Sequence, residues 1–230
     1  MRPLQDKCEP SSVEAMQQLF VEDMGTTIDA LFSEFDPNPI GVASLAQVHK
    51  AKLKDGRRVA VKIQHPHLRE FTNLECVLSR RSKLRDLMTF LVSLVTTEWL
   101  LEVIKRLFPD FEFSWLGDEM RQNLPLEMDF IHEARNTAKV TENFKSVKRT
   151  PLYIPKVHSA TQRVLIMEFI EGGRADSKEY LAYHSIDRNH VSLELARIFS
   201  EMVHLHGFFH ADPHAGEWDR SLNRRGLLIK

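Results

Sequence analysis

The sequence predicts an α+β fold in which an antiparallel β-sheet forms an N-terminal lobe and helices dominate the later part. Two features predict the sheet: a hairpin centred on Asp55-Gly56, and a second strand pair over residues 156–160 and 163–169. An amphipathic pattern over residues 187–206 predicts the helical part. Because the strands come mainly before this helix, strands and helices are expected to segregate, as in α+β proteins.

Composition places the chain among ordinary globular proteins. It has 230 residues, of which 43% are hydrophobic and 27% charged, with a formal net charge of -1. This is enough for one large domain or two small lobes, and the balanced charge gives no reason to expect nucleic acid. Cys8 and Cys76 lack metal-ligand spacing and are interpreted as reduced thiols. The first residues have neither the apolar segment of a signal peptide nor the character of a transit peptide, so no targeting sequence is visible.

The N-terminal segment predicts a helix followed by a hairpin. Residues 11–33 have helical periodicity with Ser11 or Ser12 as the cap, and the Asp36–Pro39 segment ends this region. Residues 46–53 and 58–63 then alternate between apolar and polar on either side of the Asp-Gly turn, which predicts two antiparallel strands.

The middle of the chain is predicted to be helical. Residues 68–107 form one helical region, and its stretch 87–104 is the most apolar of the chain. Glu98 interrupts that stretch, so a buried or interfacial helix is expected rather than a membrane span. A second helical region covers 115–146, where Pro125 either kinks the helix or starts a new one.

The C-terminal helix is predicted over residues 187–206, after a break at Glu171-Gly172-Gly173. Gly207 is placed as its C-cap. One face of this helix is apolar, and it comprises Val191, Leu195, Ile198, Met202 and Leu205.

Two features of the first half of the chain suggest a phosphate site. The small-residue loop 39–44 precedes a strand, and it fits either a loop that approaches phosphates or a tight turn. Lys62 lies inside an apolar strand, where an ammonium is costly unless it reaches a partner. In kinases a lysine in this context holds the α- and β-phosphates and pairs with a helix glutamate. The alternative is an edge-strand lysine that faces solvent.

Carboxylates in the second half of the chain are the remaining candidate site residues. Asp129 and Glu133 lie four residues apart and are expected to share a helix face, where like charges repel unless a cation is near. Lys62, a metal ion or an arginine would supply this positive charge. The alternative is that the two carboxylates lie on a solvated acidic face. Asp212 follows the predicted cap and precedes Pro213, where it either accepts a proton from a hydroxyl group or bonds its own backbone.

Four segments together resemble the UbiB-type (aarF-domain) atypical protein-kinase-like family, over roughly residues 11–216. They are Ser44–Ala51, Val59–Lys62, Glu127–Asp129 and His210–His214. The resemblance implies a protein-kinase-like fold with family-specific helices and, in this chain, an incomplete helical C-terminal lobe. The implied parts are a helical extension (1–35), an N-lobe with a helical insertion at about 68–115 (36–173), a partial C-lobe (174–217) and a divergent tail (218–230).

The resemblance also implies roles for individual residues. Lys62 and its helix partner Glu133 would be catalytic together with the loop aspartate Asp212. Glu127 and Asp129 would form the family's regulatory acidic motif. The nucleotide-binding residues would be the loop over the phosphates and the segment around adenine, namely Gly41, Val42, Ala43 and Ser44 with Lys62, and Glu168, Phe169 and Ile170.

The pattern then departs from the family. Glu217 stands where the family has a metal-binding Asn. It is the candidate metal ligand, since Glu can bind Mg²⁺, but its longer charged side chain would change the Mg²⁺ geometry. Residues 218–230 contain no Asp-Phe-Gly-type metal segment. We therefore expect a truncated chain with an incomplete Mg²⁺ site, a foreign ending and, over residues 79–97, an inserted stretch.

The resemblance implies an ATP-binding kinase-like protein of mitochondria, linked to lipid or coenzyme Q homeostasis. Its phosphotransfer or ATPase activity is expected to be impaired. Two alternatives stay open: a non-catalytic module that binds nucleotide or a partner, and a non-functional truncated product. Membrane or lipid association and oligomeric state are left open by the sequence.

Overall fold

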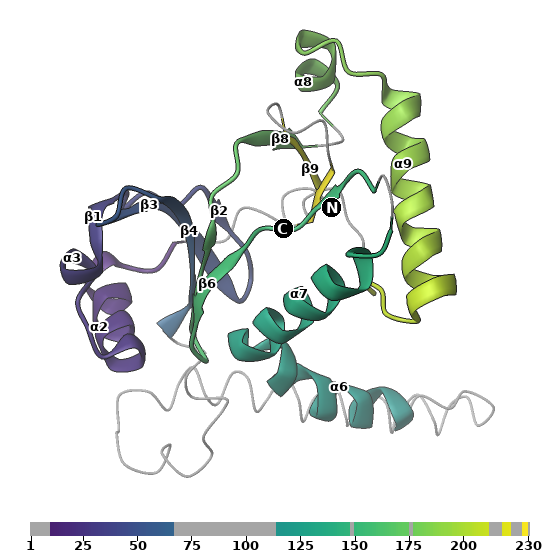
Figure 1. Ribbon diagram of the computed structural model, residues 1–230. Coiled ribbons are helices and arrows are strands. Elements are labelled where there is room, and N and C mark those ends of the chain that lie inside the picture. Colours follow the sequence, from purple (N-terminus) through teal and green to yellow (C-terminus); the bar gives the residue numbers. More distant parts are fainter. Residues whose placement is uncertain are drawn as a thin grey trace, which may run out of the picture.

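A six-stranded antiparallel sheet forms the N-terminal lobe (Figure 1), which confirms the predicted fold class. Its strands run in the order β1-β3-β4-β7-β6, with β2 paired to β3. The computed structural model describes residues 10–66, 114–147, 150–174, 177–211, 218–221 and 227–229. The strands of this sheet are β1 (Phe32–Phe35), β2 (Gly41–Val42), β3 (Ala46–Leu53), β4 (Arg58–Gln64), β6 (Val157–Ala160) and β7 (Val164–Glu168).

Both predicted hairpins are confirmed. The Asp55-Gly56 turn joins β3 to β4, in a register that runs from Ala46 opposite Gln64 to Lys52 opposite Arg58. Strands β6 and β7 form the second antiparallel pair. Strand β7 also pairs with β4, so β4 is a central strand flanked on both sides.

The single helix expected over residues 11–33 is wrong in its extent. Helix α2 (Val13–Met24) begins at the N-cap Ser12 and ends at Gly25, whose φ of 68° is left-handed. One short helical turn, α3 (Ile28–Leu31), follows, and the chain enters β1 at Phe32. The apolar pattern continues past Gly25, but a glycine in the left-handed region ends a helix whatever the pattern beyond it.

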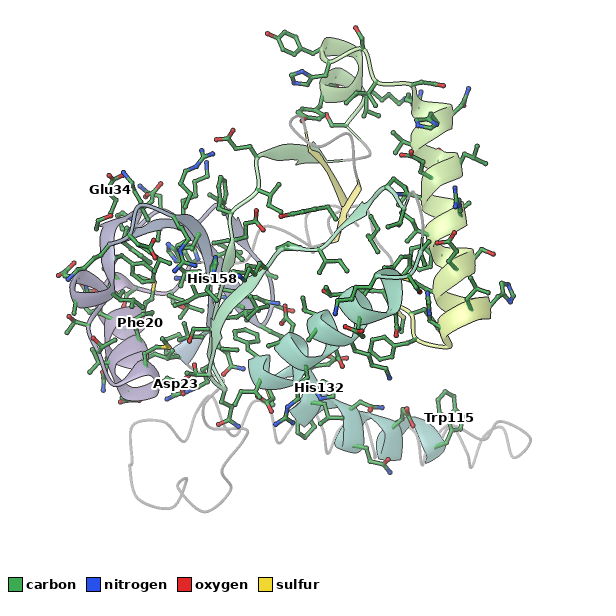
Figure 2. The ribbon with its side chains drawn as sticks, viewed as in Figure 1. Phe20, Asp23, Glu34, Trp115, His132 and His158 are labelled. Carbon is green, nitrogen blue, oxygen red and sulfur yellow. The ribbon has the colours of Figure 1, made fainter. Side chains whose placement is uncertain are left out.

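The two faces of the sheet have different neighbours. Side chains alternate along a strand, and Val59, Val61 and Ile63 of β4 are fully buried in the cluster that includes Phe20 of α2. Figure 2 shows Phe20 directed from α2 toward the sheet. Lys62 lies between Val61 and Ile63 on the strand, so its side chain projects from the other face of the sheet, where α7 begins (Figure 1).

In the described part of the chain between the hairpins, two helices follow each other. Helix α6 (Ser114–Glu127) contains Pro125 in its last turn, and helix α7 (Phe130–Phe144) begins after the N-cap Asp129. The break thus lies four residues beyond the proline that was expected to mark it. The end of α7 packs against the C-terminal helices through the buried Phe144, so α7 joins the sheet lobe to the helical part.

A second, four-stranded sheet has the order β5-β10-β9-β8. The sequence predicted no element within 218–230, yet two of these strands come from that segment. They are only three and four residues long, and pairing between such distant short segments leaves no periodic signal in the sequence. The strands are β5 (Leu152–Tyr153), β8 (Gly172–Arg174), β9 (Trp218–Ser221) and β10 (Leu227–Ile229).

The C-terminal helix is confirmed, with one correction. After α8 (Lys178–Tyr183), helix α9 (Arg188–Glu201) continues into the π-helical turn η3 (Met202–His206), and Gly207 caps it with a φ of 57°. Leu205, expected on the apolar face, is 70% exposed.

The π turn explains this error. Its i→i+5 hydrogen bonds add a residue to the turn and shift the register of the helix face. The inward position falls instead to His206, whose ring centroid lies 5.1 Å from that of the buried Phe144. The other four predicted face residues pack in the helical core, namely Val191, Leu195, Ile198 and Met202.

The predicted helical region 68–107, with its apolar stretch 87–104 and the suspected insertion 79–97, lies outside the described residues. Among the residues that the structure describes, no helix has the length and apolar character needed to cross a membrane. Trp115, near the start of α6, is 57% exposed and projects from the helix in Figure 2.

Candidate functional site

An ion pair between β4 and α7 lies at the centre of the site. The Lys62 Nζ atom is 2.9 Å from Oε1 and 2.8 Å from Oε2 of Glu133. The two side chains are 29% and 33% exposed, so solvent or a ligand can reach them. Because β4 is flanked by β3 and β7, the alternative of a solvent-facing lysine on an edge strand is wrong.

The aromatic ring of Phe130 lies against the Lys62 ammonium. The Lys62 Nζ atom lies 4.9 Å from the ring centroid, within the range of a cation–π interaction. Phe130 is 1% exposed and packs with Ala46 and Leu165. An ammonium has three N–H donors, and Glu133 takes two of them, so one remains for an anion. No sequence pattern predicts this role for Phe130, although it directly follows Asp129.

The acidic segment before α7 is arranged differently from what the sequence predicted. Asp129 has extended backbone angles (φ -108°, ψ 104°) and is the N-cap of α7, with its carboxylate accepting a hydrogen bond from the Ile131 N–H. The Asp129 carboxylate is thus used at the end of α7, while Glu133 pairs with Lys62, one of the cations that the sequence predicted for these carboxylates. Glu127 is exposed at the end of α6. A regulatory role for Glu127 and Asp129 stays a prediction.

The small-residue loop is a tight turn that joins β2 to β3. Gly41 and Val42 form β2, and the Ala43 N–H donates to the Ala46 carbonyl at 2.9 Å, with Ser44 inside the turn. His65 holds this turn, since its Nε2 donates to the Ala43 carbonyl at 2.9 Å.

The sheet register places this turn close to the lysine. Val48 is opposite Lys62 and Ala46 is opposite Gln64, so the turn follows just beyond the lysine along the strands. A role of Gly41 to Ser44 in phosphate binding remains a prediction.

The segment expected around adenine connects the two sheets. Glu168 ends β7, the Phe169 N–H donates to the Arg58 carbonyl at 3.2 Å, and Ile170 leads toward β8. The Glu168 carboxylate accepts hydrogen bonds from the Tyr153 hydroxyl at 2.7 and 2.9 Å, so this side chain is engaged within the fold.

The distance along β7 suits an extended ligand. Lys62 is opposite Leu165, three residues before Glu168. At about 3.4 Å per residue, the lysine and the connecting segment are separated by roughly 10 Å along the strand.

The far end of α7 meets the segment that leads to the predicted catalytic loop. The Lys139 Nζ atom lies 4.0 Å from the ring centroid of Phe208. Asp212 and Glu217 themselves lie outside the described residues. Within the ranges that are described, no group of three or more His, Cys, Asp or Glu side chains is arranged to hold a metal ion.

A strand lysine paired with a helix glutamate, in an antiparallel sheet joined to helices, defines a kinase-like protein. The chain belongs to the ABC1 atypical kinase-like domain family, whose model matches residues 3–221. This confirms the predicted UbiB/aarF resemblance. The match includes residues 218–221, the start of the segment that was expected to be foreign.

Named relatives support the same family. The chain is 41% identical over 218 residues to AarF domain-containing protein kinase 1 of Mus musculus, covering 94% of this chain and 38% of that protein. It is 43% identical over 222 residues to the ABC1 family protein MCP2 of Saccharomyces cerevisiae, covering 94% of this chain and 36% of that protein. The chain therefore spans little more than a third of these curated relatives.

A solved structure shares the fold. Rv3197 from Mycobacterium tuberculosis, in complex with erythromycin, superposes with a TM-score of 0.69 at 27% sequence identity. The similarity covers 96% of this chain and 51% of that one. It supports the kinase-like fold of the part of the chain that the structure describes.

Proposed function

We propose that this chain is the nucleotide-binding part of an ABC1-type atypical kinase and binds ATP beside Lys62. The observation that carries the proposal is the Lys62–Glu133 ion pair on the ligand-accessible face of the sheet. Glu133 and Phe130 hold the ammonium in place, and its remaining N–H is available to a phosphate oxygen.

The proposed pose follows the strands. Adenine would lie against the 168–170 segment and the phosphates would extend past Lys62 toward the Gly41–Ser44 turn. When bound, Mg²⁺ would neutralise charge on the β- and γ-phosphates. The residues that would hold it lie outside the described part of the chain, so the proposal assigns no step to the metal.

Phosphotransfer or ATP hydrolysis is proposed to be impaired. Asp212 would accept the proton of the attacking group, but Glu217 replaces the Asn of the family pattern. That substitution also favours the second candidate, a kinase-like module that binds nucleotide or a partner without turnover.

A mitochondrial location and a link to lipid or coenzyme Q homeostasis are further parts of the proposal, supported only by the family resemblance. Fractionation of cells that express the endogenous protein, followed by immunoblotting with an antibody against this chain, tests the location. Absence of the protein from the mitochondrial fraction would remove this part while leaving nucleotide binding untouched.

Thermal denaturation with ATP, with and without Mg²⁺, tests the central proposal. At 100 times its Kd, ATP should stabilise the folded state by about 2.7 kcal/mol. Lys62→Ala should abolish most of this shift and Asp212→Asn should keep it. Lys52→Ala is the matched control, because Lys52 pairs with Glu34 at the exposed edge of the same sheet.

Each outcome separates the candidate functions. A folded sample that shows no shift would exclude both the enzyme and the nucleotide-binding module. Stabilisation without ATP hydrolysis or phosphotransfer would favour the module. Turnover that is lost in Asp212→Asn would favour the enzyme.

A further inference from the structure

The junction between α6 and α7 is fastened to the sheet by two hydrogen bonds. The Gln64 side chain donates from Nε2 to the Met128 carbonyl at 3.1 Å. Two residues later, the Phe130 N–H donates to the Gln162 carbonyl in the β6–β7 turn at 3.0 Å. The chain is thus held on both sides of Asp129, the residue that caps α7.

Gln64 is well placed to act on the ion pair. It lies two residues after Lys62 on β4, so both side chains project from the same face of the strand. At the other end of the contact, Met128 directly precedes the N-cap Asp129, α7 starts at Phe130, and Glu133 lies in its first turn. Strand β4 therefore carries both Lys62 and Gln64. Gln64 fixes the start of α7, and α7 carries Glu133, the partner of Lys62.

Burial indicates that this hydrogen bond is a requirement of the fold at this point. Gln64 is 2% exposed and Met128 is 4% exposed. An amide in such a place is unfavourable unless it is hydrogen-bonded, and a carbonyl deprived of its donor is unfavourable too. An apolar side chain at position 64 would fill the space but leave the Met128 carbonyl without this donor.

We propose that Gln64 is a positioning residue for nucleotide binding. By holding the Met128 carbonyl it fixes the start of α7, and this keeps Glu133 against Lys62 in the orientation that presents the ammonium to phosphate. The inference rests on the proposed ATP-binding function and adds a residue to it. Gln64 itself touches no nucleotide in this account and acts through Glu133.

Substitution of Gln64 by Met tests the inference, because Met preserves the length and volume but removes the donor. Affinity for ATP and ADP should fall about tenfold, as expected for the loss of one buried hydrogen bond. Affinity for adenosine, which has no phosphate for Lys62 to hold, should change less than about twofold. Gln162→Met is the matched control: the Gln162 side chain is exposed, and its contact with α7 is made by the backbone alone.

A double-mutant cycle with Glu133→Gln distinguishes positioning from general destabilisation. If Gln64 acts through Glu133, its loss should weaken ATP binding much less in the Glu133→Gln background than in the wild type. Equal losses for ATP and adenosine, or full additivity in the cycle, would overturn the inference. Gln64→Asn, which keeps an amide but is one methylene shorter, provides the same readouts if Gln64→Met does not fold.

Hydrogen exchange supplies a readout that needs no nucleotide. Amides in the peptide 128–136 should exchange at least about fivefold faster in Gln64→Met than in the wild type. Unchanged exchange would refute the inference that Gln64 holds the start of α7. Gln162→Met should leave them unaltered. If the wild type bound no ATP, the proposed function would fail, while this measurement would still decide whether Gln64 holds α7.

Discussion

The carboxylate of Asp129 accepts a hydrogen bond from the Ile131 N–H at 2.9 Å and caps helix α7. The first N–H groups of a helix have no partner within it, and an N-cap side chain satisfies one of them. Asp129 therefore has a structural task that depends on its acceptor oxygen. Because Glu133 lies one turn further along α7, the cap also helps to fix the position of the partner of Lys62.

Replacing Asp129 separates capping from charge. Asp129→Ala should lower the free energy of unfolding by about 1 kcal/mol, whereas Asp129→Asn and Asp129→Ser should keep most of it, because both retain a capping oxygen. Urea denaturation measures the difference. Glu127→Ala, at an exposed position, is the control and should stay within about 0.5 kcal/mol of the wild type. A loss in Asp129→Asn as large as in Asp129→Ala would argue against capping.

A charge network fastens α2 to the β6–β7 turn. The Asp23 carboxylate accepts hydrogen bonds from the Thr161 hydroxyl and from the Arg163 N–H at 3.0 Å and Nε at 3.1 Å. The side chains of Asp23 and Arg163 are only 12% and 13% exposed. In Figure 2, Asp23 lies on α2 close to the sheet.

Removing Asp23 takes the nearest carboxylate away from Arg163 and leaves only the longer contact with Glu22, at 3.7 Å. The Thr161 hydroxyl keeps the Val164 carbonyl, at 3.1 Å, as an acceptor. Asp23→Ala should therefore cost about 2 kcal/mol of unfolding free energy, chiefly because a nearly buried guanidinium loses its closest partner. Guanidinium-induced unfolding provides the measurement. Glu142→Ala, which breaks an exposed pair with Lys145, should cost less than about 0.5 kcal/mol. Equal effects of the two changes would show that Arg163 is well solvated.

Local signals explain what the sequence could predict. The Asp55-Gly56 turn and the alternation around it determine the β3–β4 hairpin, because turn chemistry and period are both encoded within a few residues. Lys62 could be identified on the same basis, since an ammonium in an apolar strand requires a partner.

Contacts between distant segments explain what could not be predicted. Gln64 shares a strand face with Lys62, and this spacing was a signal in the sequence, but its partner is a backbone carbonyl that no side-chain pattern marks. The π turn after Glu201 and the short strands β9 and β10 depend likewise on tertiary packing or pairing rather than on local periodicity.

The π turn predicts opposite effects at two apolar positions. Met202 is 1% exposed and Leu205 is 70% exposed. Met202→Ala should therefore lower the unfolding free energy by about 2 to 5 kcal/mol, and Leu205→Ala should change it by less than about 0.5 kcal/mol. Thermal denaturation of the two variants checks this. Similar losses in both would mean that the helix continues with α-helical periodicity through residue 205.

The buried His49 predicts that stability depends on pH. Burial lowers the pKa of His49, and hydrogen bonding to the Asp36 carbonyl with the nearby Asp36 charge offsets part of this effect. Its Nδ1 donates to that carbonyl at 2.9 Å, while its Nε2 lies 3.0 Å from the amide nitrogen of Gln47. A proton on Nε2 would oppose this second donor, so the fold selects the neutral ring.

The sign of the effect follows from the lowered pKa. Between the pKa values of the folded and unfolded states, the unfolded chain binds more protons, so stability rises with pH. The contribution of His49 should be fully present above the ordinary histidine pKa of about 6.5 and should be lost as pH falls below it. Partial burial and the charges of Arg57 and Lys156 also lower the pKa of His158, which adds an effect of the same sign.

Urea denaturation at a series of pH values from about 7.5 to 5 measures this dependence. His49→Gln should flatten the profile in part, with His158 accounting for some of the remaining slope. His204→Gln changes the same residue type at an exposed position and serves as the control. A wild-type stability that stayed constant or increased as pH fell would contradict the assignment. So would a His49→Gln profile as steep as that of the wild type, since the buried ring could not then be the group that takes up the proton on unfolding.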